Sequence, residues 1–171
     1  MKVPPLLPEE TFHRVLRVAN FDGLSVMAIA GFLALAAASI RDFSGAAVGL
    51  AVAAAGAIEL HGVGLLRAGE RRGMSWILAS QPYLMAVLLV YCAMRLAVFD
   101  ATTLQAAVTD DLRQRIAEAG YTEERMLRQA YTLLYGLLAV GTVIYQGGMT
   151  LYYWRRRAAV EAAVVDDNRF A

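Results

Sequence analysis

Glu59 and His61 carry the most conspicuous chemistry in this chain, because they lie in a run, 43–66, that is otherwise almost wholly apolar. A run of this length can span a lipid bilayer. Ionisable side chains at that depth are costly to bury without a partner or a water-filled cavity, so they mark candidate functional sites. On one α-helix the two side chains diverge by about 200°. We therefore expect His61 to face lipid, a neighbouring subunit or an interfacial cavity, away from the pocket that holds Glu59.

Three polar side chains are expected at one depth in the membrane: Glu59, Gln81 and Gln146. Each lies eight or nine residues from the same end of the bundle, which is roughly 12 to 14 Å along a helix. The glutamine amides can hydrogen-bond the carboxyl group, whereas unpaired polar groups in hydrocarbon are unfavourable. Two interpretations stay open if the three meet, a clamp between helices or a proton or cation site. A third is that they do not meet.

Four further polar side chains in the apolar runs are secondary candidates for a site: His61, Tyr91, Arg95 and Thr142. Tyr91 and Arg95 share a helix face with Gln81, and Thr142 lies on a polar stripe with Gln146. Arg95 is near the end of its run, where a guanidinium can extend to the membrane interface. A polar stripe is improbable against lipid, so we expect it to face protein.

Composition excludes several other classes of protein. The chain is 58% hydrophobic and 18% charged, more apolar than a typical soluble domain. Its net charge is +1 and its basic residues are scattered, which argues against nucleic-acid binding. Cys92 is the single cysteine, so no internal disulfide can form. No residues have metal-ligand, phosphate-loop or nucleophile spacing, and we therefore expect no metal, no cofactor and no enzymatic activity.

Four apolar runs predict the elements that position these residues. We expect transmembrane helices at about 23–40, 43–66, 74–99 and 126–154, with amphipathic segments at about 9–20 and 103–119. The turn Arg41-Asp42 is too short for anything but antiparallel neighbours. The sequence thus predicts an all-α integral membrane protein, a single domain over 1–171. It is an antiparallel four-helix bundle with an N-terminal interfacial helix and an extracytoplasmic amphipathic helix between the third and fourth crossings.

Small residues share a face with Glu59 on the second of these helices. The face consists of Gly45, Gly49, Val52, Gly56, Glu59 and Val63, and it contains a GxxxG match. Small residues let helix backbones approach closely in membranes. We therefore expect another helix to pack against this face.

Basic residues predict the orientation. Ten of the 16 lie on the side of the N-terminus and six on the other, which favours a bacterial cytoplasmic membrane with both termini cytoplasmic. The function expected first is a non-enzymatic structural or accessory subunit, partnered by lipid and by its own copies or other membrane subunits. The alternative is a small oligomeric transporter or channel with a proton or cation site centred on Glu59.

Overall fold

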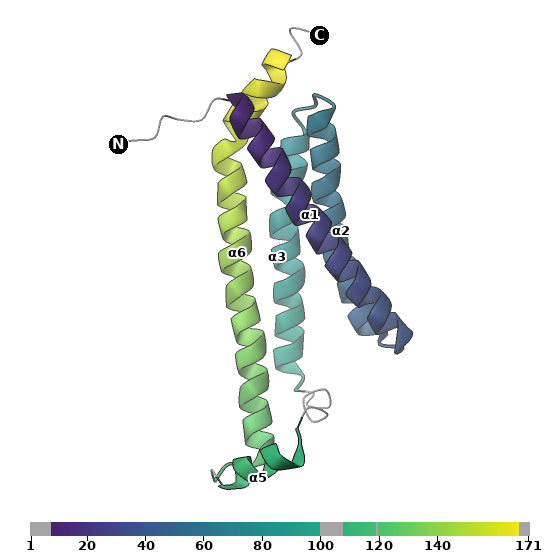
Figure 1. The fold of residues 1–171 in the computed structure, drawn as a ribbon, viewed down its shortest axis with the longest axis vertical. Coiled ribbons are helices and arrows are strands. Elements are labelled where there is room, and N and C mark those ends of the chain that lie inside the picture. The colour runs from purple at the N-terminus through teal and green to yellow at the C-terminus, as the bar shows by residue number, and fades with distance from the viewer. Residues whose placement is uncertain (1–7, 100–107, 119, 168–171) are drawn as a thin grey trace, which may run out of the picture. The chain divides into compact units, whose positions relative to one another are not determined.

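The computed structural model describes residues 8–99, 108–118 and 120–167. All elements in these ranges are α-helices (Figure 1): α1 Pro8–Ser39, α2 Phe43–Arg67, α3 Gly73–Ala97, α5 Asp110–Glu118 and α6 Glu123–Asp167. Four of them, α1, α2, α3 and α6, are long and apolar enough to cross a membrane. The all-helical class and the four long apolar helices are therefore confirmed.

Two predicted boundaries are wrong. The segments 9–20 and 23–40 form one continuous helix, α1, instead of an interfacial helix followed by a membrane helix. Pro8 is the only proline in α1 and stands at its first position, where a missing N–H costs nothing. The backbone hydrogen bonds of α1 therefore continue without a break through residues 20–23.

The last helix is longer than predicted at its C-terminal end. α6 continues to Asp167, beyond the predicted end at 154. Val160 and Val164 keep the apolar face buried past the arginines, and Arg157 and Glu161 form an i, i+4 ion pair at 2.6 Å. α5 covers 110–118 of the predicted segment 103–119, and residues 103–107 and 119 of that segment lie outside the described residues.

The chain divides into two compact units. The first comprises residues 1–87 and 145–171, and the second comprises residues 88–144. In the first unit one apolar core joins all four long helices: Val15, Leu16, Ala19, Val63, Leu66, Met74, Ile77, Tyr153, Val160 and Val164. In the second unit a smaller core is built from Cys92, Tyr131 and Tyr135.

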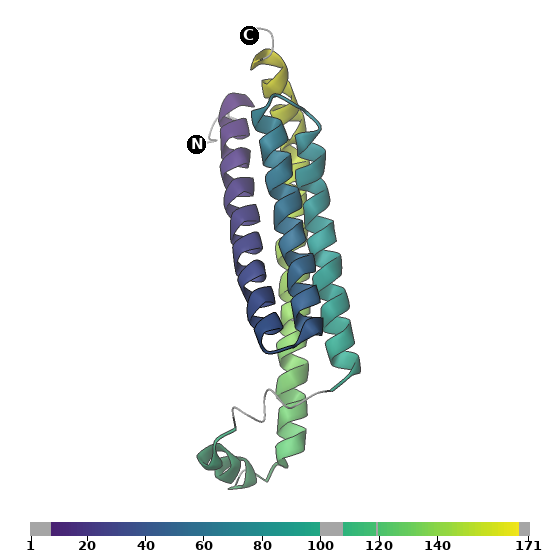
Figure 2. The ribbon, with the colours of Figure 1, turned by 90° about the vertical axis from the view of Figure 1, so that its right-hand side faces the viewer.

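α1 and α2 lie side by side and are joined by a short turn (Figure 2). Asp42 caps α2, because its Oδ1 accepts a hydrogen bond from the Gly45 N–H at 2.9 Å. The two helices cross closely at Gly23 and Gly56, where a Cβ on Gly56 would stand 2.5 Å from the Gly23 carbonyl oxygen. The prediction that another helix packs on the small-residue face of 43–66 is confirmed.

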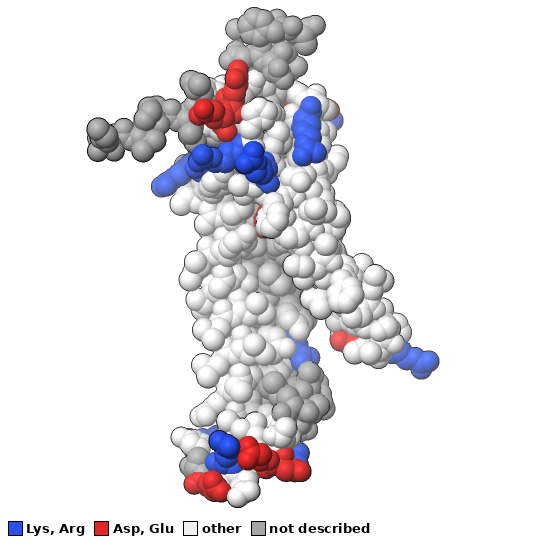
Figure 3. All heavy atoms as spheres, viewed as in Figure 1, with Lys and Arg blue, Asp and Glu red and all other residues white. Residues whose placement is uncertain are grey.

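The helices expose many large apolar side chains. On α1, Phe21 is 75% exposed and Phe32 71%, and on α6, Leu137 and Ile144 are each 70% exposed. In the first unit the charged side chains gather near the helix ends and leave a long uncharged surface between them (Figure 3). Such a surface is typical of helices that face lipid.

Candidate functional site

Five side chains from all four long helices meet inside the first unit. They are Asp22 of α1, Glu59 of α2, Gln81 of α3, and Tyr145 and Tyr153 of α6, and we call them the carboxyl cluster. Four of them are almost inaccessible, with exposures of 6% for Asp22, 3% for Glu59, 1% for Gln81 and 0% for Tyr153. The fifth, Tyr145, is 53% exposed.

Hydrogen bonds join the cluster into one chain. The Gln81 amide donates from Nε2 to Glu59 Oε2 at 3.1 Å and to Asp22 Oδ2 at 3.4 Å. The Tyr153 hydroxyl donates to Glu59 Oε1 at 2.8 Å, and the Tyr145 hydroxyl donates to Asp22 Oδ1 at 2.9 Å. Each carboxyl oxygen therefore accepts one hydrogen bond from an uncharged donor.

The two carboxyl groups have no counter-ion within the described residues. Neither Asp22 nor Glu59 forms an ion pair there with a basic side chain. Both groups are hydrogen-bonded to the same Gln81 amide. The same amide that bridges them leaves its oxygen, Gln81 Oε1, buried without a hydrogen-bond partner among the described residues. An unpaired buried acceptor is uncommon, and here it belongs to the amide that joins two acids.

Glycine crossings place the two acids side by side. Asp22 directly precedes Gly23, and Glu59 lies one turn after Gly56, on the face that contacts α1. A Cβ added to Gly23 would stand 3.3 Å from the Glu59 Cβ. The absence of side chains at this crossing thus lets the carboxyl groups of different helices share one amide.

The structure brings together two of the three predicted site residues. Glu59 and Gln81 are hydrogen-bonded, as expected if their depths match. Gln146 is buried, with 4% exposure, but its side chain does not join the carboxyl cluster in the described hydrogen bonds, and its Oε1 has no partner. Tyr145 and Tyr153 of the same helix supply the donors instead.

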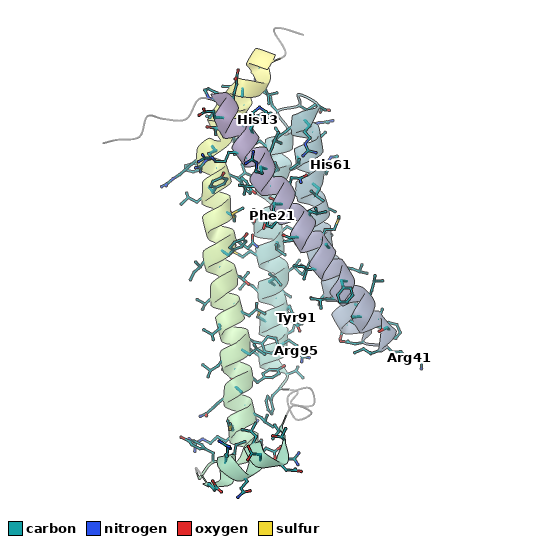
Figure 4. The ribbon with its side chains drawn as sticks, viewed as in Figure 1. His13, Phe21, Arg41, His61, Tyr91 and Arg95 are labelled. Carbon is teal, nitrogen blue, oxygen red and sulfur yellow. The ribbon has the colours of Figure 1, made fainter. Side chains whose placement is uncertain are left out.

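His61 takes no part in the carboxyl cluster. Its exposed side chain packs edge-on against Trp76, with 5.2 Å between ring centroids, and Figure 4 shows it on α2. Glu59 by contrast is buried. The two side chains diverge, as their spacing on one helix predicts.

The other secondary candidates lie in the second unit. The Arg95 Nε donates to the Tyr135 hydroxyl at 3.1 Å, and its guanidinium lies 5.7 Å from the Tyr131 ring centroid and 5.6 Å from that of Tyr135. Tyr91 contacts the Tyr135 ring edge-on at 5.9 Å (Figure 4). Thr142 is buried, with 7% exposure. Arg95 and the tyrosines around it thus form a separate arginine–tyrosine cluster in the second unit, and none of these residues belongs to the carboxyl cluster.

Sequence reasoning missed Asp22. The apolar stripe of 9–20 passes through Val15 and Ala19, and one further helical step reaches Asp22. Continuing the helix through 20–23 would have put this acid on the buried face. Tyr153 lies on the same helix face as Gln146, but the sequence predicts a site role for neither Tyr153 nor Tyr145.

The carboxyl cluster is suited to hold a proton or a small cation, since two acids with only neutral donors around them lack a compensating positive charge. Within the described ranges, no group of three or more His, Cys, Asp or Glu residues could hold a metal ion.

Comparisons of the chain with protein-family models, with curated proteins and with solved structures found no match.

Proposed function

We propose that this chain is an integral membrane protein that works as a small oligomeric transporter or channel for a proton or cation. The four long apolar helices form an antiparallel bundle in a bacterial cytoplasmic membrane, with both termini in the cytoplasm. Their exposed apolar surface supports the membrane setting, and the distribution of basic residues supports the orientation.

One observation carries the transport proposal. Asp22 and Glu59, from different helices, are buried and bridged by a single amide, with no basic partner among the described residues. Two uncompensated negative charges inside an apolar bundle are very unfavourable. Binding of a proton or cation lowers the electrostatic free energy of the two buried carboxylates, and its release raises that energy again. A site that carries an ion needs this reversible binding.

Flux through the purified protein tests this function. Full-length protein in liposomes should move protons or monovalent cations, and Glu59→Gln and Asp22→Asn should each abolish the flux while the protein still assembles. Asp111→Asn is the matched control, because Asp111 is an exposed acid on α5 with an exposed partner, Arg115. Flux that survives in both cluster variants, or that is lost in the control, would contradict the proposal.

The second candidate function is a structural or accessory membrane subunit without transport activity. The glycine crossing at Gly23 and Gly56 favours it, because such close backbone contact is typical of helices whose main task is assembly. In that case the cluster only clamps the helices. Wild-type liposomes would then show no flux, while Glu59→Leu would still weaken the bundle.

A further inference from the structure

The carboxyl cluster is one hydrogen short of satisfying its acceptors. Its donors supply four hydrogens, two from the tyrosine hydroxyls and two from the Gln81 amide, whose nitrogen also lies 3.5 Å from the Ser80 hydroxyl oxygen. Its acceptors are the four carboxyl oxygens and Gln81 Oε1, and the last of these has no partner. Ser80 does not supply the missing hydrogen, because its hydroxyl donates to the Ile77 carbonyl at 2.8 Å.

The same cluster carries an uncompensated charge. The titratable groups that face one another from the four helices are Asp22, Glu59, Tyr145 and Tyr153, and none of them is basic. One added proton supplies the missing hydrogen and removes one of the two negative charges. A single added proton therefore accounts for both the missing hydrogen and the excess negative charge.

A metal cation fits this geometry less well than a proton. The Gln81 nitrogen, with its two hydrogens, stands between Asp22 Oδ2 and Glu59 Oε2, where a bridging metal would have to bind. Hard cations require about six or more oxygen ligands that point lone pairs at the ion. The hydroxyls and the amide nitrogen here point hydrogens at the carboxyl oxygens instead.

Only one member of the cluster reaches the surface. Tyr145 is 53% exposed, whereas the other four members are at most 6% exposed. Tyr145 donates to Asp22, and Tyr153 at the opposite end is fully buried against Glu59. Tyr145 lies within the apolar span of α6, so it meets water only through a gap between copies of the proposed oligomer. A proton that enters there meets Tyr145 and Asp22 before Glu59.

We propose that Asp22 and Glu59 share a single proton, which they exchange with the outside past Tyr145. In this step a hydronium ion gives its proton to the Tyr145 oxygen and leaves as water, while the Tyr145 O–H bond breaks and an O–H bond forms at Asp22 Oδ1. The acquired proton stays on the acid pair, which then carries one negative charge instead of two. This inference deepens the proposed function, on which it rests, by naming the ion as a proton and one residue as its route.

Infrared spectroscopy of the purified full-length protein in detergent tests the shared proton. We expect one protonated-carboxyl stretch at neutral pH that shifts in D2O and is absent from the double variant Asp22→Asn, Glu59→Gln. Adding sodium or potassium chloride at constant pH should leave it unchanged. A missing band, or a band that these salts remove, would overturn the proton assignment in favour of an uncompensated pair or a metal cation.

The rate of deuterium uptake by that band tests the route. Tyr145→Phe should slow exchange by about 100-fold, the lower end of what a positioned proton-transferring side chain contributes. Tyr83→Phe is the matched control, since Tyr83 is a partly exposed tyrosine of α3 outside the carboxyl cluster, and its exchange should stay near the wild-type rate. Equal rates in the two variants would contradict the Tyr145 route. Size-exclusion chromatography should confirm that each variant is folded.

The two proposals fail separately. A protonated-carboxyl band without any flux in liposomes would refute transport and leave the shared proton in place. Flux of a metal cation without a protonated-carboxyl band would refute the shared proton and leave transport in place.

Discussion

Replacing Gly56 with alanine tests how α1 and α2 hold the carboxyl cluster together. The new Cβ would stand 2.5 Å from the Gly23 carbonyl oxygen, 2.7 Å from the Met27 nitrogen and 3.0 Å from the Met27 Cβ. Backbone atoms cannot turn aside as the end of a side chain can, so the helices must move apart. Overpacking of this kind costs about 1 to 3 kcal/mol.

Gly64→Ala is the matched control. Gly64 is also in α2, but a Cβ there would meet nothing within 4 Å. Both substitutions gain the same helix preference of alanine over glycine, about 1 kcal/mol or less, so the difference between them isolates the crossing. We expect Gly56→Ala to be less stable than Gly64→Ala by about 1 to 3 kcal/mol in reversible detergent unfolding. Equal stability of the two variants would refute the close crossing.

Three further predictions concern the cluster, the exposed histidine and the topology. Glu59→Leu should lower bundle stability in detergent by roughly 0.6 to 2 kcal/mol, the range for polar contacts between membrane helices, whereas Glu59→Gln should stay near wild type; a fully stable Glu59→Leu variant would exclude a clamp. His61→Ala should leave flux unchanged, because the side chain packs on Trp76 outside the cluster; lost flux would place His61 on the ion path. Cysteines at Asp42 and Asp110 should react with impermeant reagent from outside cells, and reaction only from the cytoplasmic side would invert the topology.

The sequence predicts the two central helices closely. α2 and α3 end within about two residues of the runs 43–66 and 74–99, because charged or glycine-containing turns flank both runs. The first helix was predicted in two pieces, since Asn20 to Gly23 interrupts the apolar pattern. In the structure the helix continues through Asp22 and Gly23. Both residues are buried against other helices, so a polar residue and a glycine at these positions do not mark the end of the helix.

The depth estimate found the Glu59–Gln81 contact, which links residues far apart along the chain. It failed for Gln146, although this residue is buried. Gln146 lies between Tyr145 and Tyr153 in sequence, so its level along α6 is not the reason. Tyr145 and Tyr153 supply the hydrogen bonds from α6 to the two acids, and no pattern of spacing reveals which neighbouring side chain makes that contact.

The glycine crossing would link helix assembly and the proposed proton binding in one set of contacts. Gly23 and Gly56 fix the distance between α1 and α2, and Asp22 and Glu59 flank that crossing. A proton shared by two acids requires a short distance between them, whereas two ionised acids repel each other across the same gap. We therefore expect loss of the proton to push the two helices apart at their closest point. If the cluster exchanges a proton, the packing of α1 on α2 should change with it. The residues that hold these two helices together would then be the same residues that bind the proton.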